Sequence, residues 1–181
     1  MARVPYRGPD EVDEQYRDYV VSSLQPGKAI NVYAAVANNE EVLAGLRAFL
    51  SSLWDSSGMT DRQREIVILT AAAETENAYE WHQHANIAGE DVLSLAELAA
   101  IAEDDPAPFD AEEVALQEYA RAVVTGTVTD EIHDALAETF DDRTLAGAAA
   151  TAAGYLALGR MIEAFGVEIE TDDEFVGWDP R

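Results

Sequence analysis

The sequence predicts an all-α protein, a multi-helix array built from one chain of 181 residues. Apolar residues recur at the spacing of a single helix face in successive segments, and residues that favour helix N-termini precede several of these segments. Proline and glycine fall mostly at the ends of the segments or in the terminal stretches. Because 48% of the residues are apolar, the chain can bury a sizeable core without help from disulfides.

The first half of the chain is expected to form four helices. They are expected over residues 11–24, 30–37 and 40–53, and from a start just after residue 60. Pro26 and Gly27 end the first, since proline interrupts the backbone ladder and glycine favours the position after a helix. Thr60 and Gln63 match a capping box, in which each side chain bonds the backbone N–H of the other. The apolar stretch Ile66–Leu69 follows at once, which makes this the clearest helix start.

The second half is expected to form five more helices. They are expected over residues 77–89 and 94–102, from a cap at 110 through 124, from a cap at 129 through 140, and from 141 or 142 to 165. Aspartate and threonine suit such caps because their side-chain oxygens accept a bond from a free N–H of the first turn. Gly147, Ala150 and Gly154 share one face of the last helix, where another backbone can approach closely. Packing within one subunit and a subunit interface both remain open.

The charge balance is strongly acidic, with 36 acidic against 11 basic residues and a formal net charge of −25. Nucleic acid is therefore not expected as a partner, because phosphate binding draws on clustered lysine and arginine. The acidic residues run along the chain from Asp10 to Asp179 rather than in one block. That distribution is typical of a halophilic protein, since molar salt screens the repulsion that would strain the fold in dilute buffer.

Several function classes are excluded by what the chain lacks. It contains no cysteine, which removes disulfides, thiolate metal sites and thiol redox chemistry. No apolar stretch of signal-peptide length follows Met1, and the uncharged stretch from Thr144 to Gly159 is too short and too rich in alanine and glycine to span a membrane. We therefore expect a cytoplasmic protein with no membrane partner.

A dense patch of polar and aromatic residues, ETENAYEWHQH, ends at His84. His82 and His84 lie about 200° apart around a helix, so they face opposite ways and no metal site is expected. Glu80 lies one helical turn before His84 and can touch it, and Trp81 lies three residues before it. This arrangement can orient the imidazole of His84.

Glu65 shares its helix face with apolar residues, where a carboxylate needs a hydrogen-bond donor or keeps its proton. His84, on the following helix, is the natural partner. A glutamate and a histidine in contact form a general acid/base pair, in which the carboxylate fixes the tautomer of the imidazole. A purely structural pair is the alternative that the spacing leaves open.

At these residues the chain resembles the carboxymuconolactone decarboxylase family, which includes alkylhydroperoxidases, from about Asn31 to Ile169. The resemblance is carried by four features: the stretch Met59–Ile66, the 18 residues between Glu65 and His84, the triplet Tyr79-Glu80-Trp81 with its histidine three residues later, and the pattern Gly154–Arg160. It implies the helical array of that family. In the peroxidase branch two cysteines precede the histidine, and the matching places here hold Asn77 and Glu80.

The resemblance implies a cofactor-free decarboxylase or related lyase that acts on a small carboxylated lactone or a dicarboxylic acid. Glu65 and His84 carry over as the catalytic acid/base pair. The substrate-binding residues implied are Tyr79, Glu80, Trp81 and Arg160. Arg160 is the first choice to grip a substrate carboxylate and Arg64 the second, although an ordinary ion pair is the alternative for each.

The resemblance also implies a homo-oligomer with its pocket near subunit contacts. We expect a helical extension over residues 1–29, the family-like domain over 30–169 and an acidic tail over 170–181. Two other functions stay open: a peroxidase-related, alkylhydroperoxidase-like stress protein without redox cysteines, and a helical scaffold without catalysis. No cofactor is expected for any of them.

Overall fold

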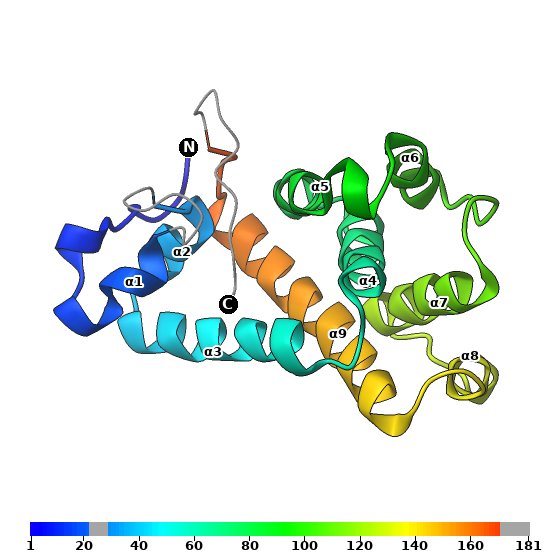
Figure 1. Cartoon of the computed structure of the whole chain (residues 1–181). Helices are drawn as coiled ribbons and strands as arrows, with labels where there is room; N and C mark the ends of the chain where they lie inside the picture. The colour runs from blue at the N-terminus through cyan, green and yellow to red at the C-terminus, as the bar shows by residue number, and fades with distance from the viewer. Residues whose placement is uncertain (22–28, 171–181) are drawn as a thin grey trace. The chain divides into compact units, whose positions relative to one another are not determined.

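The computed structural model describes residues 1–21 and 29–170, and within these ranges the chain is helical, with no strand beyond an isolated bridge between Val21 and Ala29 (Figure 1). The all-α prediction is confirmed. The helices are α1 (Arg17–Val20), α2 (Asn31–Val36), α3 (Glu40–Ser56), α4 (Asp61–Glu74), α5 (Ala78–Val92), α6 (Leu95–Glu103), α7 (Ala111–Thr125), α8 (Asp130–Ala137) and α9 (Asp142–Phe165).

The chain forms two compact units, one of Met1–Asp55 with Arg160–Arg181 and one of Ser56–Gly159. These bounds differ from the three parts expected from the sequence, which stay a prediction. Residues 22–28 and 171–181, with Pro26, Gly27 and most of the expected acidic tail, lie outside the described residues.

Helix α4 is the centre of the second unit, where it packs against α5, α6 and α7 (Figure 1). Every residue from Arg64 to Ala72 is buried, because α4 is covered on all sides. Val67 joins a cluster with Leu116 of α7 and Leu136 of α8. Ile66 and Leu69 join a second cluster that contains residues of α5 and α6. A helix surrounded in this way places any polar side chain that it carries inside the core.

The expected capping residues begin their helices. Thr60 accepts a bond from the Gln63 N–H at 3.2 Å, and the Gln63 side chain accepts one from the Thr60 N–H at 2.9 Å. Side-chain oxygens also cap the starts of α6, α7 and α8, from Ser94, Asp110 and Thr129. Of the two candidates for the cap of α9, the structure has Asp141, which accepts a bond from the Thr144 N–H at 2.9 Å, and α9 begins at the next residue.

Helix α9 packs closely at Gly147. A Cβ atom at this position would lie 2.0 Å from the backbone oxygen of Ser57. The glycine therefore serves packing within the chain, one of the two alternatives that the sequence left open. Helix α9 is long and apolar enough for a membrane span by composition, but 56% of its apolar window is buried, as in the core helix of a soluble fold.

Two expected helix bounds are wrong. Residues 11–24 do not form one helix: two 3₁₀ turns, Pro9–Glu11 and Glu14–Tyr16, precede the short α1. The Asp13 N–H bonds the side chain of Glu40, and Val21 pairs with Ala29, so tertiary contacts replace the local helix. Helix α8 ends at Ala137 rather than at residue 140, because the chain must leave the helix before the cap of α9. Gly89, the expected end of the fifth helix, has a non-helical backbone inside α5.

Candidate functional site

Glu65 and His84 meet in the core of the second unit. The Nδ1 atom of His84, on α5, lies 2.8 Å from the Oε2 atom of Glu65, on α4. Glu65 is 2% exposed and His84 is 3% exposed, so the contact is shielded from solvent. The expectation that the carboxylate on the apolar face of α4 finds His84 as its partner is confirmed. The pair has the composition and geometry of a general acid/base pair.

Arg64 adds a positive charge on the other side of the carboxylate. Its Nε atom lies 3.8 Å from the Oε1 atom of Glu65, and its Nη2 atom donates to Asp61 at 2.9 Å. The Arg64 side chain is buried and both of these partners belong to α4, so the two contacts are not the surface or interhelical ion pair that the sequence offered as the alternative for Arg64. A buried cation next to a buried carboxylate offsets part of the cost of removing both from water.

Tyr155 of α9 orients the imidazole from a third element. Its ring meets the His84 ring edge to face, with 4.8 Å between ring centroids and an interplanar angle of 86°. Tyr155 is fully buried. Tyr155 was not among the site residues expected from the sequence, although a tyrosine within an uncharged, alanine-rich stretch is a visible signal. The imidazole is therefore fixed by a carboxylate at Nδ1 and by an aromatic ring at its side.

Glu80 and Asn77 connect the same end of α5 to α9. Asn77 caps α5 by accepting a bond from the Glu80 N–H at 3.0 Å, and its Nδ2 donates to the Gly159 carbonyl at 3.2 Å. A Cβ atom at Gly159 would lie 3.2 Å from the Oε2 atom of Glu80, so this carboxyl group lies against the backbone of α9. Glu80 is itself buried. The places that hold cysteines in the resembled peroxidase branch thus carry an amide and a carboxyl group in contact with α9.

The other expected binding residues lie in different surroundings. Tyr79 is buried, whereas Trp81 lines a cavity of about 210 Å³ with Ala72 and Ala102. Arg160 belongs to the other unit, is 59% exposed at its side chain and forms an ion pair with Glu163 at 2.8 Å. The structure therefore brings Glu65 and His84 together within one unit, and the role expected for Arg160 stays a prediction.

Two cavities of the second unit lie away from the pair. Neither the cavity at Trp81 nor one of about 450 Å³ along α7 is lined by Glu65 or His84. Across residues 1–21 and 29–170, no group of three or more acidic or histidine side chains is arranged to hold a metal ion. A buried imidazole held by a carboxylate can transfer protons.

Comparison with known families and with curated proteins finds no match for the sequence. Solved structures with the same fold include the alkylhydroperoxidase AhpD core of an uncharacterized peroxidase-related protein from Ralstonia eutropha JMP134. That protein is 19% identical, with a TM-score of 0.82 over 94% of this chain and 93% of the other. An uncharacterized peroxidase-related protein from Silicibacter sp. TM1040 is 16% identical, with a TM-score of 0.81 over 94% and 92%.

A variant of a debrominase in complex with 2,3,4-tribromopyrrole also has this fold. It is 15% identical, with a TM-score of 0.76 over 94% of this chain and 92% of the other. At these identities the likeness establishes the fold alone, which is the AhpD-like helical array that the resemblance implied. It does not extend to a decarboxylase reaction, since one fold hosts many functions.

Proposed function

We propose that this chain is an enzyme that transfers protons through Glu65 and His84, without a cofactor and without a thiol. The 2.8 Å contact between the two side chains carries the proposal. A carboxylate and an imidazole, both buried in the centre of a helical core, are costly to keep there unless they are paired. Their pairing positions an imidazole, the side chain that most often serves in general acid/base catalysis.

Each member of the pair has a distinct part in this proposal. Glu65 accepts the Nδ1–H bond, which fixes the tautomer, so His84 exchanges protons with a substrate at Nε2. Arg64 supplies positive charge 3.8 Å from the carboxylate, and the Tyr155 ring limits rotation of the imidazole. Glu65 and Tyr155 act through His84 and are positioning residues, whereas His84 is the catalytic residue.

The reaction that we propose is loss of CO₂ from a small carboxylated lactone or a dicarboxylic acid. The bond between the carboxylate carbon and its neighbour breaks, and the electron pair stays on that neighbour as an enolate. Protonated His84 donates its Nε2 proton to this carbon, CO₂ leaves, and the imidazole regains a proton from solvent. Tyr79, Glu80 and Trp81 are proposed to line the substrate site, and Arg160 to bind a substrate carboxylate by two parallel hydrogen bonds.

A peroxidase-related stress function is the second candidate, favoured by the peroxidase-related proteins that share the fold. Because the chain has no cysteine, such a function excludes a disulfide cycle. The two candidates differ in one measurable way. The acid/base enzyme releases CO₂ from an organic acid, whereas the peroxidase-related protein consumes an organic hydroperoxide. A scaffold does neither.

The test is an assay of CO₂ release from γ-carboxymuconolactone and small dicarboxylic acids in D₂O. Wild-type protein is expected to release CO₂ and place one solvent deuteron on the product carbon. His84→Gln should lower the rate at least about 100-fold with the fold intact, since proton transfer by a positioned side chain contributes about 10² to 10⁴. His133→Gln is the matched control, because His133 is exposed on α8. An active His84→Gln variant would refute the proposal.

The same proposal includes a cytoplasmic homo-oligomer. Oligomer size is measured by light scattering on the purified chain at constant salt. If the chain is a monomer at all concentrations, the proposed homo-oligomer is wrong, and the role proposed for His84 is unaffected.

A further inference from the structure

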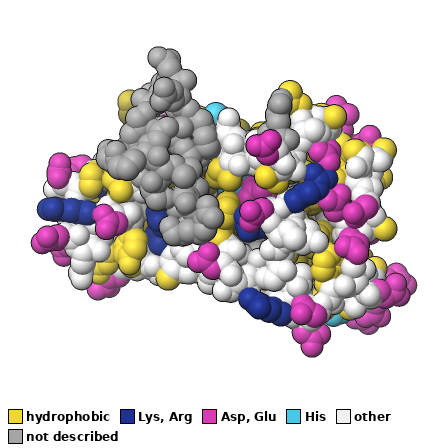
Figure 2. Space-filling view, viewed as in Figure 1, with side chains coloured by type: hydrophobic (Ala, Val, Ile, Leu, Met, Phe, Trp, Pro, Cys, Tyr) yellow, Lys and Arg dark blue, Asp and Glu magenta, His cyan; other side chains and the backbone are white. Residues whose placement is uncertain are grey.

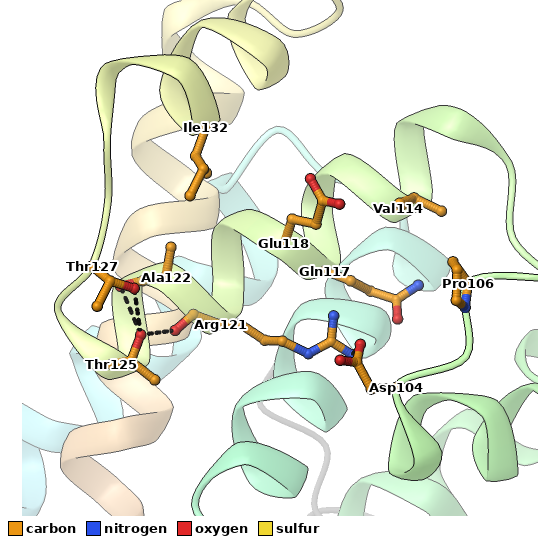
Figure 3. Close-up of a pocket in the computed structure, with 10 residues that line it drawn as sticks. All are labelled: Asp104, Pro106, Val114, Gln117, Glu118, Arg121, Ala122, Thr125, Thr127 and Ile132. Carbon is orange, nitrogen blue, oxygen red and sulfur yellow. Dashed lines mark hydrogen bonds and ion pairs between the residues drawn. The ribbon is translucent and has the colours of Figure 1, made fainter.

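A second cavity of the Ser56–Gly159 unit shares no residue with the proton-transfer site. This α7 cavity has a volume of about 450 Å³ and lies between α7, the loop after α6 and the start of α8 (Figure 3). Its polar lining includes Asp104, Gln117 and Arg121, and its apolar lining includes Val114 and Ile132. A cavity that combines a few polar groups with apolar side chains is typical of a small-molecule site.

Arg121 is the cation of the α7 cavity. Its Nη2 atom lies 2.6 Å from Asp104, and the two side chains are 22% and 73% exposed. Asp104 follows the end of α6 in the left-handed backbone region, with φ 56° and ψ 40°. An ion pair with one partner so exposed contributes little stability, so another carboxylate can replace Asp104 at small cost.

Gln117 is the second donor of the α7 cavity. It lies one helical turn before Arg121, so both side chains project from the same face of α7 toward Asp104 and the loop after α6 (Figure 3). Gln117 is 2% exposed, and its Nε2 atom is buried with no hydrogen-bond partner among the described residues. A buried donor without an acceptor is unfavourable, and such a group calls for an explanation.

We propose that the α7 cavity binds the carboxylate of a small organic acid. The Arg121 guanidinium donates hydrogen bonds to both carboxylate oxygens of the ligand, and the Gln117 amide donates to one of them. In the ligand-free protein Asp104 takes the place of the ligand and pairs with the guanidinium. The hydrocarbon part of the acid lies against Val114, which is beside Gln117 and Pro106 in Figure 3. This proposal rests on the α7 cavity and is independent of the reaction proposed for His84.

The charges of the cavity favour a monocarboxylate. Two acidic side chains, Asp104 and Glu118, line it against the one guanidinium of Arg121. A second negative charge on the ligand would meet these carboxylates in a chain whose net charge is already −25. Dicarboxylates and phosphates should therefore bind more weakly than an acid with one carboxylate and an apolar tail.

Calorimetric titration with hexanoate tests the proposal, with hexanamide as the matched uncharged ligand and the salt concentration held constant. Hexanoate should bind at least about tenfold more tightly than hexanamide, because a charge-assisted bidentate pair is stronger than a neutral one. Arg121→Gln should abolish this preference. If that variant does not fold, Arg121→Lys keeps the charge, loses the planar fork and should bind hexanoate more weakly.

Replacing the competing carboxylate should have the opposite effect. Asparagine tolerates the left-handed backbone, so Asp104→Asn should keep the local structure. The variant should bind hexanoate up to about fivefold more tightly, because the ligand no longer has to displace an exposed ion pair. Glu118→Gln removes the same charge from the cavity but does not free the guanidinium, so binding should change less than about twofold.

Gln117→Met offers an independent check. It removes the buried donor at similar volume, so it should weaken hexanoate binding while thermal stability without ligand stays equal or rises. Three outcomes would overturn the proposal: equal binding of hexanoate and hexanamide, undiminished binding by both Arg121 variants, or equal strengthening by Asp104→Asn and Glu118→Gln.

Discussion

Glu65→Gln is the sharpest test of the buried pair, because it removes one charge and keeps the size of the side chain. In the wild-type protein the Nδ1 atom of His84 lies 2.8 Å from a charged acceptor, the Glu65 carboxylate. In the variant, the amide oxygen of glutamine can still accept a hydrogen bond from His84 Nδ1–H. Arg64 loses the carboxylate 3.8 Å from its Nε atom. Two unit charges near 4 Å are worth about 4 kcal/mol at an effective dielectric constant of about 20.

Part of that energy is offset, since the neutral amide is cheaper to bury than the carboxylate, and Arg64 keeps Asp61 as a partner. We therefore expect Glu65→Gln to lower the free energy of unfolding by about 1 to 3 kcal/mol. For a chain of this size that corresponds to a melting temperature lower by about 2 to 12 °C. Calorimetric melting at constant salt measures the change.

Glu163→Gln is the control, because Glu163 makes an exposed ion pair with Arg160 and the same substitution there should cost less than about 1 kcal/mol. If Glu65→Gln melts at or above the wild-type temperature, the carboxylate contributes nothing to the core, and the pairing argument fails.

The remaining predictions concern packing, acid and salt. Gly147→Ala should destabilise the protein by about 1 to 3 kcal/mol, since its Cβ would meet the Ser57 backbone. Gly45→Ala in α3 has open space and should stabilise the protein by about 0.5 to 1 kcal/mol, and melting curves measure both changes. Arg62 lowers the pKa of Glu97 from 4.5 to about 2, so this stabilisation is complete above pH 4.5 and is lost as the pH falls toward 2. Arg62→Gln should therefore flatten the fall in stability over that range in urea titrations, and an unchanged slope would contradict the assignment. The melting temperature should rise between dilute buffer and molar KCl, because the net charge is −25, and an unchanged value would remove the halophilic interpretation.

Local chemistry made the helix starts predictable. Thr60, Asp110 and Thr129 each bond an N–H three residues ahead, so the whole interaction lies within a few residues of sequence. The failure at residues 11–24 has the opposite cause. There the Asp13 N–H bonds Glu40, a contact that no local pattern contains.

The same distinction applies to the candidate site. The pairing of Glu65 with His84 was predictable, because a carboxylate on an apolar helix face needs a donor and the next helix supplied one histidine facing the right way. The contact between Tyr155 and His84 was not, since it joins helices α5 and α9 through packing alone. The burial of Arg64 beside Glu65 also depends on how completely α4 is surrounded.

Acidic side chains are spread over the face drawn in Figure 2, with few basic ones between them. On the surface, a carboxylate is well hydrated and its position is of little consequence to stability. Glu65 is instead buried on α4, as are Ile66, Ile68 and Leu69, and an apolar side chain gains about 2 kcal/mol by such burial without needing a partner. Because replacing a whole buried ion pair by well-packed apolar residues often matches or exceeds its stability, packing alone does not require the pair of Glu65 and His84. What the pair adds to α4 and α5 is an oriented imidazole, which is the feature that the proposed proton transfer uses.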